Sequence, residues 1–571
     1  MQTLIQDLLQ QNQHRPERLL AILHGIQDHH RYIPDAAMKQ IAKSLNIPWT
    51  QVLSVVEFYS FFHTKPCGAY DILISDSITD RMLGNQQIID RISQRLNVAP
   101  GTVRPDGQVS LDTTSCTGLC DQGPAALING WAIAYLDRQL DQVCELIEQR
   151  RPMADWPAAL FQVQDNIQRT GLLLDKTIRP GQAISQALTQ GADAMLQAVE
   201  QSGLRGRGGA GFKTAMKWRF CREENTDQRY VICNADEGEP GTFKDRVLLS
   251  RYAEQVFEGM TCAGLTIGAS QGVLYLRGEY RFLLAALHDT LARRRAAGLL
   301  GDNIQGSGQA FDIDICLGAG AYICGEESAL IESLEGKPGI PRNRPPYPVT
   351  HGYLGKPTVV NNVETFLAAA HIAAFGAADF AALGTKQSKG TKILSVCGDC
   401  ARSGIYEVPF GTSIADVLKA CGADNAAGAQ IGGPSGTYID QREFNRKLAF
   451  EDLATGGSFM VFNASRNVLE TVDNFTHFFN HESCGFCTPC RVGTALLRKQ
   501  LDKIVSGHGS AGDVVELEAL CQVIKQNSHC GLGQTAANPI LSTLERYPEL
   551  YQQQLKKISY EPGFDLDAAL A

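Results

Sequence analysis

Apolar residues recur at helical spacing in the first 60 residues, in the stretches LIQDLLQ, ERLLAILHGIQ and DAAMKQIAKSL. Pro34 and Pro48 stand at expected helix starts. Beyond residue 70, short apolar runs (YDILIS, PAALING, WAIAYL) alternate with amphipathic stretches (NQQIIDRISQRL, LDQVCELIEQR). The pattern predicts a helical segment over 1–60 and a small α/β domain over 61–150.

The remaining pattern divides the chain further. A polar stretch that contains proline, 151–180, predicts a linker. Apolar runs that end in glycine-rich turns (RYVICNA, GVLYLRG, FDIDICLG) predict an α/β domain over 181–390, and TKILSVCG with IGGPSGTYI predicts a β-rich domain over 391–470. Helical spacing returns over 471–555, and 556–571 is typical of a tail. A chain of 571 residues is too long for one core, so we expect a multidomain α/β protein.

The composition limits the kinds of partner and the cellular compartment that we expect for the chain. The net charge of −9 argues against nucleic acid or an anionic membrane surface as partner. The first residues lack the apolar core of a signal peptide, and no apolar run is long enough for a membrane span. Seventeen cysteines without a secretion signal indicate a reducing compartment, so we expect a cytoplasmic protein.

Four cysteines give the strongest chemical signal. Cys484, Cys487 and Cys490 occur in the run CGFCTPC, and Cys530 follows in SHCGLG. A [4Fe–4S] cluster needs four thiolate ligands, and three close ligands with one distant ligand suit it. An all-cysteine zinc site is the alternative, but it usually takes its ligands as two separated CxxC pairs. The spacing favours the iron–sulfur cluster.

A glycine-rich stretch, LRGRGGAGF over 204–212, matches GxGxxG at Gly206, Gly208 and Gly211. A dinucleotide fingerprint must follow a strand, whereas the preceding segment, DAMLQAVEQSG, has a helical pattern. The usual Rossmann interpretation therefore fails. A loop rich in backbone amides remains as a cradle for a phosphate and a flat ring. Basic residues stand close to it in the sequence, namely Arg205, Arg207 and Lys217.

Three other segments concentrate carboxylates and amides around glycine. They are NADEGEPGTFKDR over 234–246, GAGAYICGEES over 318–328, and VNNVET from Val360. Such groups suit sugar hydroxyls, which need acceptors as well as donors. Together with the glycine loop they predict a site for a flavin and a nucleotide.

These motifs, with PRNRPPY and the four cysteines, resemble in their order the flavin-binding NADH dehydrogenase subunit of respiratory complex I over roughly residues 180–555. The resemblance implies an FMN-binding domain, a ubiquitin-like β-grasp domain and a helical bundle with one [4Fe–4S] cluster. For FMN it implies Gly206, Arg207, Gly208, Lys217, Asn234, Asp236, Glu237, Gly238, Tyr322, Gly325, Glu326, Asn361 and Asn362. For NAD(H) it implies Phe212, Phe220, Glu239, Glu327, Arg344 and Tyr347.

Residues 1–150 resemble the thioredoxin-like subunit of complex I, which holds a [2Fe–2S] cluster on two cysteine pairs. Only the second pair is present, as Cys116 and Cys120, whereas Ser75 and Asp80 occupy the region of the first. Cys67 lies upstream, and eight extended residues cover roughly 26 Å. Oxygen ligands bind sulfide-bridged iron less well, so a [2Fe–2S] cluster is doubtful.

A fusion of these two modules resembles the flavin (diaphorase alpha) subunits of soluble NAD-reducing [NiFe] hydrogenases. The resemblance implies reversible hydride transfer between NAD(H) and FMN, then single-electron transfer to the cluster. It implies an iron–sulfur electron-transfer subunit and hydrogenase subunits as partners. No histidine stands in an acid–base constellation, so no catalytic residue is assigned. The alternatives are the flavin subunit of an NAD-linked formate dehydrogenase or another complex I-like NADH dehydrogenase, and a non-catalytic scaffold for electron carriers.

Overall fold

A computed structural model describes residues 1–556, so the predicted tail lies outside the described residues except for its first residue. Within this part of the chain no helix is both long and apolar enough to cross a membrane. Helices fill the N-terminal segment as predicted, and Pro34 and Pro48 are the N-caps of the third and fourth. Their bounds are α1 (Gln2–Gln11), α2 (Leu19–His30), α3 (Asp35–Leu45) and α4 (Trp49–Phe58).

A five-stranded sheet with the order β2-β3-β1-β4-β5 follows these helices. β1 and β3 are parallel, and the amphipathic helices α6 and α7 share one buried core with the sheet. The predicted small α/β domain is therefore present. The bounds are β1 (Tyr70–Ser75), α5 (Ile78–Met82), α6 (Asn85–Leu96), β2 (Thr102–Val103), β3 (Val109–Thr114), β4 (Ala126–Ile128), β5 (Trp131–Ile133) and α7 (Leu136–Glu148).

The central domain contains a parallel sheet of four strands with the order β10-β7-β8-β9. The strands are β7 (Tyr230–Ala235), β8 (Gln271–Leu276), β9 (Asp312–Leu317) and β10 (Thr358–Asn362). The helices are α9 (Gln182–Gln190), α10 (Ala192–Ser202), α11 (Thr214–Glu223), α12 (Lys244–Arg251), α13 (Ala253–Ile267), α14 (Leu284–Ala296), α15 (Glu327–Leu334), α16 (Pro348–His351), α17 (Val363–Phe375) and α18 (Ala378–Ala382).

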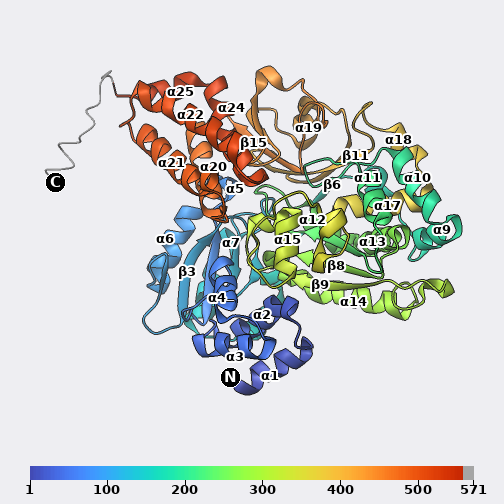
Figure 1. The fold of residues 1–571 in the computed structure, drawn as a ribbon. Coiled ribbons are helices and arrows are strands. Elements are labelled where there is room, and N and C mark those ends of the chain that lie inside the picture. The colour runs from blue at the N-terminus through green and yellow to red at the C-terminus, as the bar shows by residue number, and fades with distance from the viewer. Residues whose placement is uncertain (557–571) are drawn as a thin grey trace.

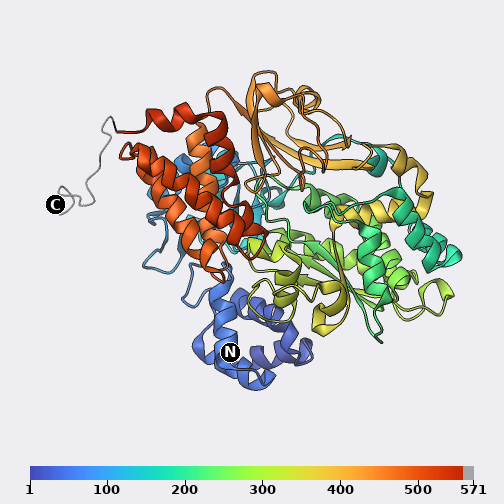
Figure 2. The ribbon, with the colours of Figure 1, turned by 45° about the horizontal axis from the view of Figure 1, so that its top comes forward.

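Both faces of this sheet are covered, as a parallel sheet requires. Val231 and Cys233 of β7 belong to the core that contains α13 and α17. Their neighbours Tyr230 and Ile232 belong to a second core, which contains α15 and the N-terminal helices α1 to α4. In Figures 1 and 2 these helices lie below the central domain. The N-terminal segment is thus a covering layer of the central sheet.

A third sheet has six strands in the order β14-β13-β15-β11-β12-β6. β6 (Ile167–Arg169) comes from the stretch predicted as a linker and pairs with β12. In the same stretch, α8 (Leu172–Asp175) buries Leu173 and Leu174. That stretch is therefore more ordered than its polar composition indicates. The other elements are β11 (Thr391–Gly398), β12 (Gly404–Pro409), α19 (Ile414–Cys421), β13 (Ala426–Ile431), β14 (Thr437–Asp440) and β15 (Ser458–Asn463).

The last described part of the chain is helical, as predicted. Its helices lie above the β1–β5 sheet in Figure 1 and in front of it in Figure 2. Asn474 of α20 donates a hydrogen bond to the carbonyl oxygen of Asp76, which fixes this contact. The bounds are α20 (Val468–Glu482), α21 (Thr488–Val505), α22 (Ala511–Asn527), α23 (Gly531–Thr535), α24 (Asn538–Arg546) and α25 (Pro548–Gln553).

Candidate functional site

The predicted flavin residues gather at the carboxyl edge of the central sheet. The chain runs from β7 to β8 to β9 in one direction and then places β10 on the other side of β7. Such a switch of direction opens a crevice beyond the strand ends, where ligands of open parallel sheets bind. Asn234, the last residue but one of β7, is paired in register with Asn362 at the end of β10. The sheet order itself therefore brings these two amides together.

Hydrogen bonds hold the polar side chains at this edge. Asn234 Nδ2 donates to the carbonyl oxygen of Gly325, 2.8 Å away. Asn361 Oδ1 accepts a hydrogen bond of 2.9 Å from the indole of Trp218, which is fully buried. Sequence segments that are about 90 and 140 residues apart thus meet at one edge.

The glycine loop lies against the end of β10. It is closed by a bridge between Arg205 and Lys213, after which α11 begins. A Cβ atom on Gly208 would lie 3.3 Å from Cβ of Asn362, so the loop backbone passes close to the strand end. At Gly209, with φ +129°, nothing lies within 4 Å of a Cβ position. The loop follows helix α10, so the prediction of a non-Rossmann loop is confirmed.

Lys217 joins the loop side of the site to its opposite wall. Its Nζ atom donates to Glu327 Oε2 at 2.7 Å and to the carbonyl oxygen of Val360 at 3.1 Å. Near it, large aromatic side chains are exposed: Phe212 by 48% and Phe220 by 42%. Exposed rings of this kind can stack on a flat heterocycle.

Asp236 offers an unused acceptor. Its Oδ2 atom is buried and has no hydrogen-bond partner among the described residues. Burial raises the pKa of Asp236 well above its usual range. A buried acceptor without a partner costs about 1–3 kcal/mol, so a hydroxyl or N–H of a ligand would be stabilising here. This unpaired oxygen fits the polar chain or ring of a flavin nucleotide.

The two following acidic residues are already bonded. Glu237 accepts hydrogen bonds of 2.8 Å from the Tyr280 hydroxyl and the amide of Asp245, and burial raises its pKa to about 7. Glu239 accepts from the Tyr322 hydroxyl at 2.5 Å and from the amide of Ser435 at 2.8 Å. Burial also raises its pKa to about 7.

Glu326 stands between the predicted flavin and nucleotide residues. Its Oε2 atom caps α15 by accepting from the amides of Ser328 and Ala329. Its Oε1 atom pairs with Arg344 at 3.1 Å. Tyr347, three residues after Arg344, is 54% exposed.

Gly238 lies against the Tyr322 ring. A Cβ on Gly238 would lie 2.9 Å from that ring, so glycine is needed at this contact.

Arg207 is engaged elsewhere. Its guanidinium is buried and donates to the carbonyl oxygens of Arg205 and Lys389, and it lies 4.8 Å from the Phe410 ring centroid. Its amide donates to Thr365 Oγ1 at 2.9 Å. Neither group is directed to a phosphate in this structure.

A buried ion network under the site escaped the sequence interpretation. Lys244 Nζ donates to Asn362 Oδ1 at 3.1 Å and to Asp245 at 2.6 Å, and it lies 3.3 Å from Glu364. Lys392 at the start of β11 donates to the same Glu364 carboxylate. Neighbouring cations hold the pKa of Glu364 below its usual range despite burial. Lys244 belongs to the motif NADEGEPGTFKDR and Glu364 to the motif VNNVET. Their place in these motifs was the sequence signal that could have pointed to the network.

The four predicted cluster cysteines line one cavity. Apolar side chains enclose it, including Ile323, Phe486 and Leu532. Cys487 and Cys530 are the N-caps of α21 and α23, and Cys484 and Cys490 flank Cys487 in the chain. Burial raises the pKa of the Cys490 thiol to about 12 and that of Cys530 to about 11. A bound metal must therefore displace these protons, and the donor set fits a four-thiolate cluster.

His529 lies beside this cavity without an acid–base partner. Its Nε2 atom is 3.2 Å from the carbonyl oxygen of Arg342, and its ring meets the edge of Phe486.

The N-terminal cysteine pair has a different environment. The sulfur atoms of Cys116 and Cys120 lie 3.4 Å apart in the buried core. Ser75 Oγ donates to Asp80 Oδ2 at 2.6 Å, and Asp80 Oδ1 accepts from the amide of Ala125. Burial raises the pKa of Asp80 to about 6. The oxygens thus bond to protein donors, and this set does not fit a four-ligand [2Fe–2S] cluster. Cys67 precedes β1, at the opposite end from Ser75, as predicted.

Three family models match successive parts of the chain. The thioredoxin-like [2Fe-2S] ferredoxin matches residues 5–151. The Nuo51 FMN-binding domain matches 199–371, and the NADH-ubiquinone oxidoreductase-F iron-sulfur binding region matches 470–554.

Similar proteins extend this agreement. The chain is 42% identical to the NAD-reducing hydrogenase HoxS subunit alpha of Cupriavidus necator, over 100% of this chain and 98% of the relative. It is 38% identical to an NADH-quinone oxidoreductase subunit of Aquifex aeolicus, over 68% of this chain and 93% of the relative. A crystal structure of an NAD+-reducing [NiFe]-hydrogenase in the H2-reduced state matches with a TM-score of 0.92 and 43% identity, over 97% of this chain and 95% of that chain. The chain therefore belongs to the family of NAD-reducing hydrogenase alpha subunits.

Proposed function

We propose that the chain is the diaphorase subunit of an NAD-reducing hydrogenase. It transfers hydride reversibly between NAD(H) and FMN and passes electrons one at a time to a [4Fe–4S] cluster. One observation carries the proposal. The short turn Tyr322–Gly325 contacts both sites, because Gly325 accepts from Asn234 at the sheet edge while Ile323 lines the cysteine cavity. Electrons from a flavin at the edge then have only a short protein segment to cross.

FMN, when bound, accepts two electrons with a hydride and gives them up singly. The protein's contribution is binding and orientation. The amides of the glycine loop and the ammonium of Lys217 offset phosphate charge, and the unpaired Asp236 carboxylate oxygen accepts from a flavin or ribityl donor. Asn234, Asn361 and the other residues that the resemblance implies for FMN belong to this half. For Arg207 this structure supports no direct role.

The nucleotide half of the site is formed by the exposed rings and by the groups around Glu327. Phe212 and Phe220 offer faces for the flat rings of NAD(H). Glu327 and Glu239 suit ribose hydroxyls, and Tyr347 and Arg344 border the same region. No side chain has to move a proton in the hydride step, so no catalytic acid is proposed.

The finer features of the fold belong to the proposal. We infer that β11 to β15 with α19, which shares their core, form the β-grasp domain. We infer that α20 to α25 form the helical bundle that binds the cluster through Cys484, Cys487, Cys490 and Cys530. The domain boundaries given above and the cytoplasmic location stay predictions. The expected partners are the iron–sulfur and hydrogenase subunits.

Two measurements test the function. The purified full chain should reduce an artificial dye with NADH, whereas a non-catalytic scaffold would show no such activity. Within the complex isolated from its host, H2 should reduce NAD+, and the complex should contain nickel. Molybdenum with formate-driven reduction would instead assign the chain to an NAD-linked formate dehydrogenase.

A further inference from the structure

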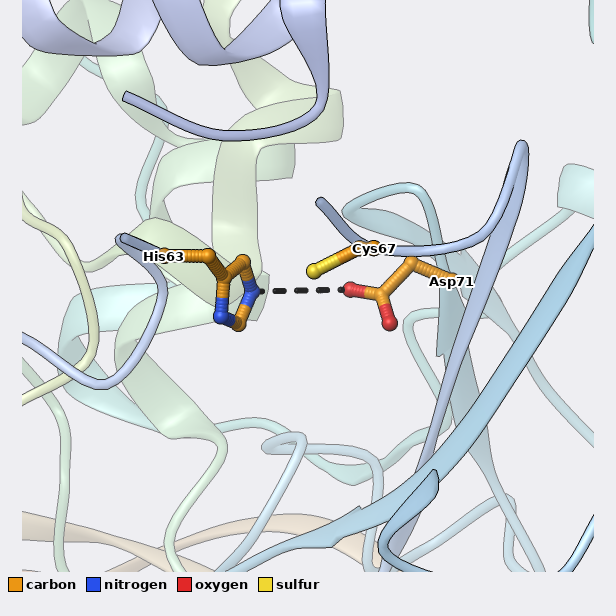
Figure 3. Close-up of side chains that lie close together, drawn as sticks. All are labelled: His63, Cys67 and Asp71. Atoms are coloured by element: carbon orange, nitrogen blue, oxygen red, sulfur yellow. Dashed lines mark ion pairs between the residues drawn. The ribbon is translucent and has the colours of Figure 1, made fainter. Parts of the chain in front are cut away.

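A cluster of three potential metal ligands lies outside both sites described above. His63 Nε2, Cys67 Sγ and a carboxylate oxygen of Asp71 all lie within 4.8 Å of one another. The three residues follow one another at intervals of four: His63 and Cys67 lie in the loop between α4 and β1, and Asp71 is the second residue of β1. Figure 3 shows the thiol and the carboxylate directed toward the imidazole ring.

We propose that His63, Cys67 and Asp71 form a binding site for a divalent transition metal, with zinc as the expected ion. Imidazole nitrogen, thiolate sulfur and carboxylate oxygen are the zinc ligands found in proteins. Three of them with a fourth position open to solvent make an open tetrahedral site. The metal would fasten the loop that connects the N-terminal helices to the β1–β5 sheet.

The geometry needs only small movements. Around a tetrahedral zinc ion with bonds of about 2.0–2.3 Å, ligand atoms lie about 3.4–3.6 Å apart. His63 Nε2 and Asp71 Oδ2 are already 3.8 Å apart. That distance is too long for a direct hydrogen bond, so the His63–Asp71 pair contributes little stabilisation without a metal. The remaining separations, at most 4.8 Å, close by shifts of about 1 Å.

Hydrogen bonds with neighbouring residues hold the proposed ligands in position. Ser110 Oγ donates to Asp71 Oδ1 at 2.6 Å, which leaves Oδ2 for the metal. The amide of Asp71 donates to Asn129 Oδ1, and the amide of His63 donates to Gln27 Oε1, both at 2.8 Å. Supporting hydrogen bonds of this kind orient ligands and are typical of metal sites.

The solvent exposure of the three proposed ligands and their charge also suit a cation. His63 and Asp71 are 28% and 19% exposed, and all three ligands line a cavity that opens to the surface. Arg31 lines the same cavity and opposes a cation. Once the metal displaces the proton of Cys67, a thiolate and a carboxylate supply two negative charges, which balance the two positive charges of zinc. Arg281 of this cavity is already paired with Asp28.

The test uses the full chain with its iron–sulfur cluster in place. Chelator-treated protein receives excess Zn2+, and loosely bound metal is removed by gel filtration. We expect one zinc per chain, and zinc-edge X-ray absorption should show one sulfur neighbour at about 2.3 Å and nitrogen or oxygen neighbours at about 2.0 Å. Four sulfur neighbours would place the zinc in the cluster cavity, and that result, or the absence of retained zinc, overturns the proposal.

Variants locate the ion. Cys67→Ser and His63→Gln should weaken zinc affinity at least about 100-fold, and Ser110→Ala about 10-fold, because it only orients Asp71. Cys316→Ser is the control, since that partly buried thiol lies outside the cavity, and it should retain zinc. Unchanged zinc affinity in Cys67→Ser, with normal FMN and iron content, would refute the assignment. The X-ray absorption result on the unmodified chain stands even if a variant fails to fold.

Discussion

Replacing Glu364 by glutamine removes the anion from the buried network beneath the flavin site. Glu364 is fully buried, as are its partners Lys392 and Lys244, and the Arg207 guanidinium lies 4.0 Å away. The substitution leaves Lys244 and Arg207 as buried cations with Asp245 as the carboxylate nearest to Lys244. Burial already lowers the pKa of Lys392 to about 7, so this lysine can lose its proton once Glu364 is removed. Because Lys244 also holds Asn362, the disturbance reaches the end of β10.

The magnitude follows from this burial. Removing one partner of a buried ion pair costs about 3–5 kcal/mol, because the remaining charge is left unpaired in a poorly polarisable interior. Glu364 serves two lysines, but Lys392 can lose its proton, so we expect the loss to fall within that range and not above it. For a domain of 150–250 residues, each kcal/mol lowers the unfolding temperature by about 2–4 °C. The Glu364→Gln chain should therefore unfold about 6–20 °C lower and bind FMN more weakly.

Thermal unfolding followed by flavin fluorescence measures both effects. Glu200→Gln is the matched control, because Glu200 pairs with Arg219 at the surface and is 51% exposed. Such an exposed pair is worth at most about 1 kcal/mol. The double variant Glu364→Gln with Lys392→Met should recover part of the loss, since it removes a buried amine that has lost its carboxylate partner. A drop of less than 3 °C in the single variant would refute the reasoning.

Three further changes test the two sites. Glu327→Gln should raise KM for NADH at least about fivefold while FMN stays bound, because a charge-assisted hydrogen-bond acceptor is lost. Loss of flavin with unchanged KM would contradict the division of the site into an FMN half and a nucleotide half. The unmodified chain should contain about four irons, with no additional [2Fe–2S] signal in electron paramagnetic resonance after reduction, and Cys530→Ala should lose cluster iron but keep FMN. The pKa of Glu239 is raised to about 7 in the folded state, whereas it is about 4.5 in the unfolded state. Between these two pH values the folded state holds a proton that the unfolded state has lost. The free energy of unfolding therefore falls as pH rises toward 7. Glu239→Gln should flatten that slope in melting temperatures measured between pH 5 and 8, and an unchanged slope would exclude Glu239 as its source.

Local chemistry was readable from the sequence because it resides in contiguous stretches. The run CGFCTPC and the glycine loop have their functional spacing within a few residues, so no knowledge of the fold was needed. The presence of helices was equally accessible: the helical pattern of DAMLQAVEQSG over 193–203 predicted α10, and this alone excluded the Rossmann interpretation.

Long-range pairing was not accessible in the same way. β6 is three residues long and polar, and only its pairing with β12 makes it a strand. The buried Lys392 belongs to a strand that begins about 30 residues after Glu364, so their contact depends on how two domains pack. Arg207 stands next to a phosphate-type loop, yet its long side chain reaches back to Lys389 instead. In each case the deciding partner is remote in the sequence.

The N-terminal module shows how the region of a cluster can serve as an interface. Arg277, which follows β8 of the central domain, donates to the carbonyl oxygen of Cys116 at 2.8 Å. Arg246 of α12 donates to the carbonyl oxygen of Gly118 and pairs with Asp121, all of them buried. Two arginines of the flavin-binding domain thus hold the loop that carries the remaining cysteine pair. These charged hydrogen bonds fix the loop on the side of the central domain, and near it in the small α/β domain Ser75 Oγ donates to Asp80 Oδ2. The N-terminal module and the central domain are therefore joined by buried, charged hydrogen bonds at this loop, and the module's lack of an ordinary four-cysteine [2Fe–2S] cluster stays a prediction.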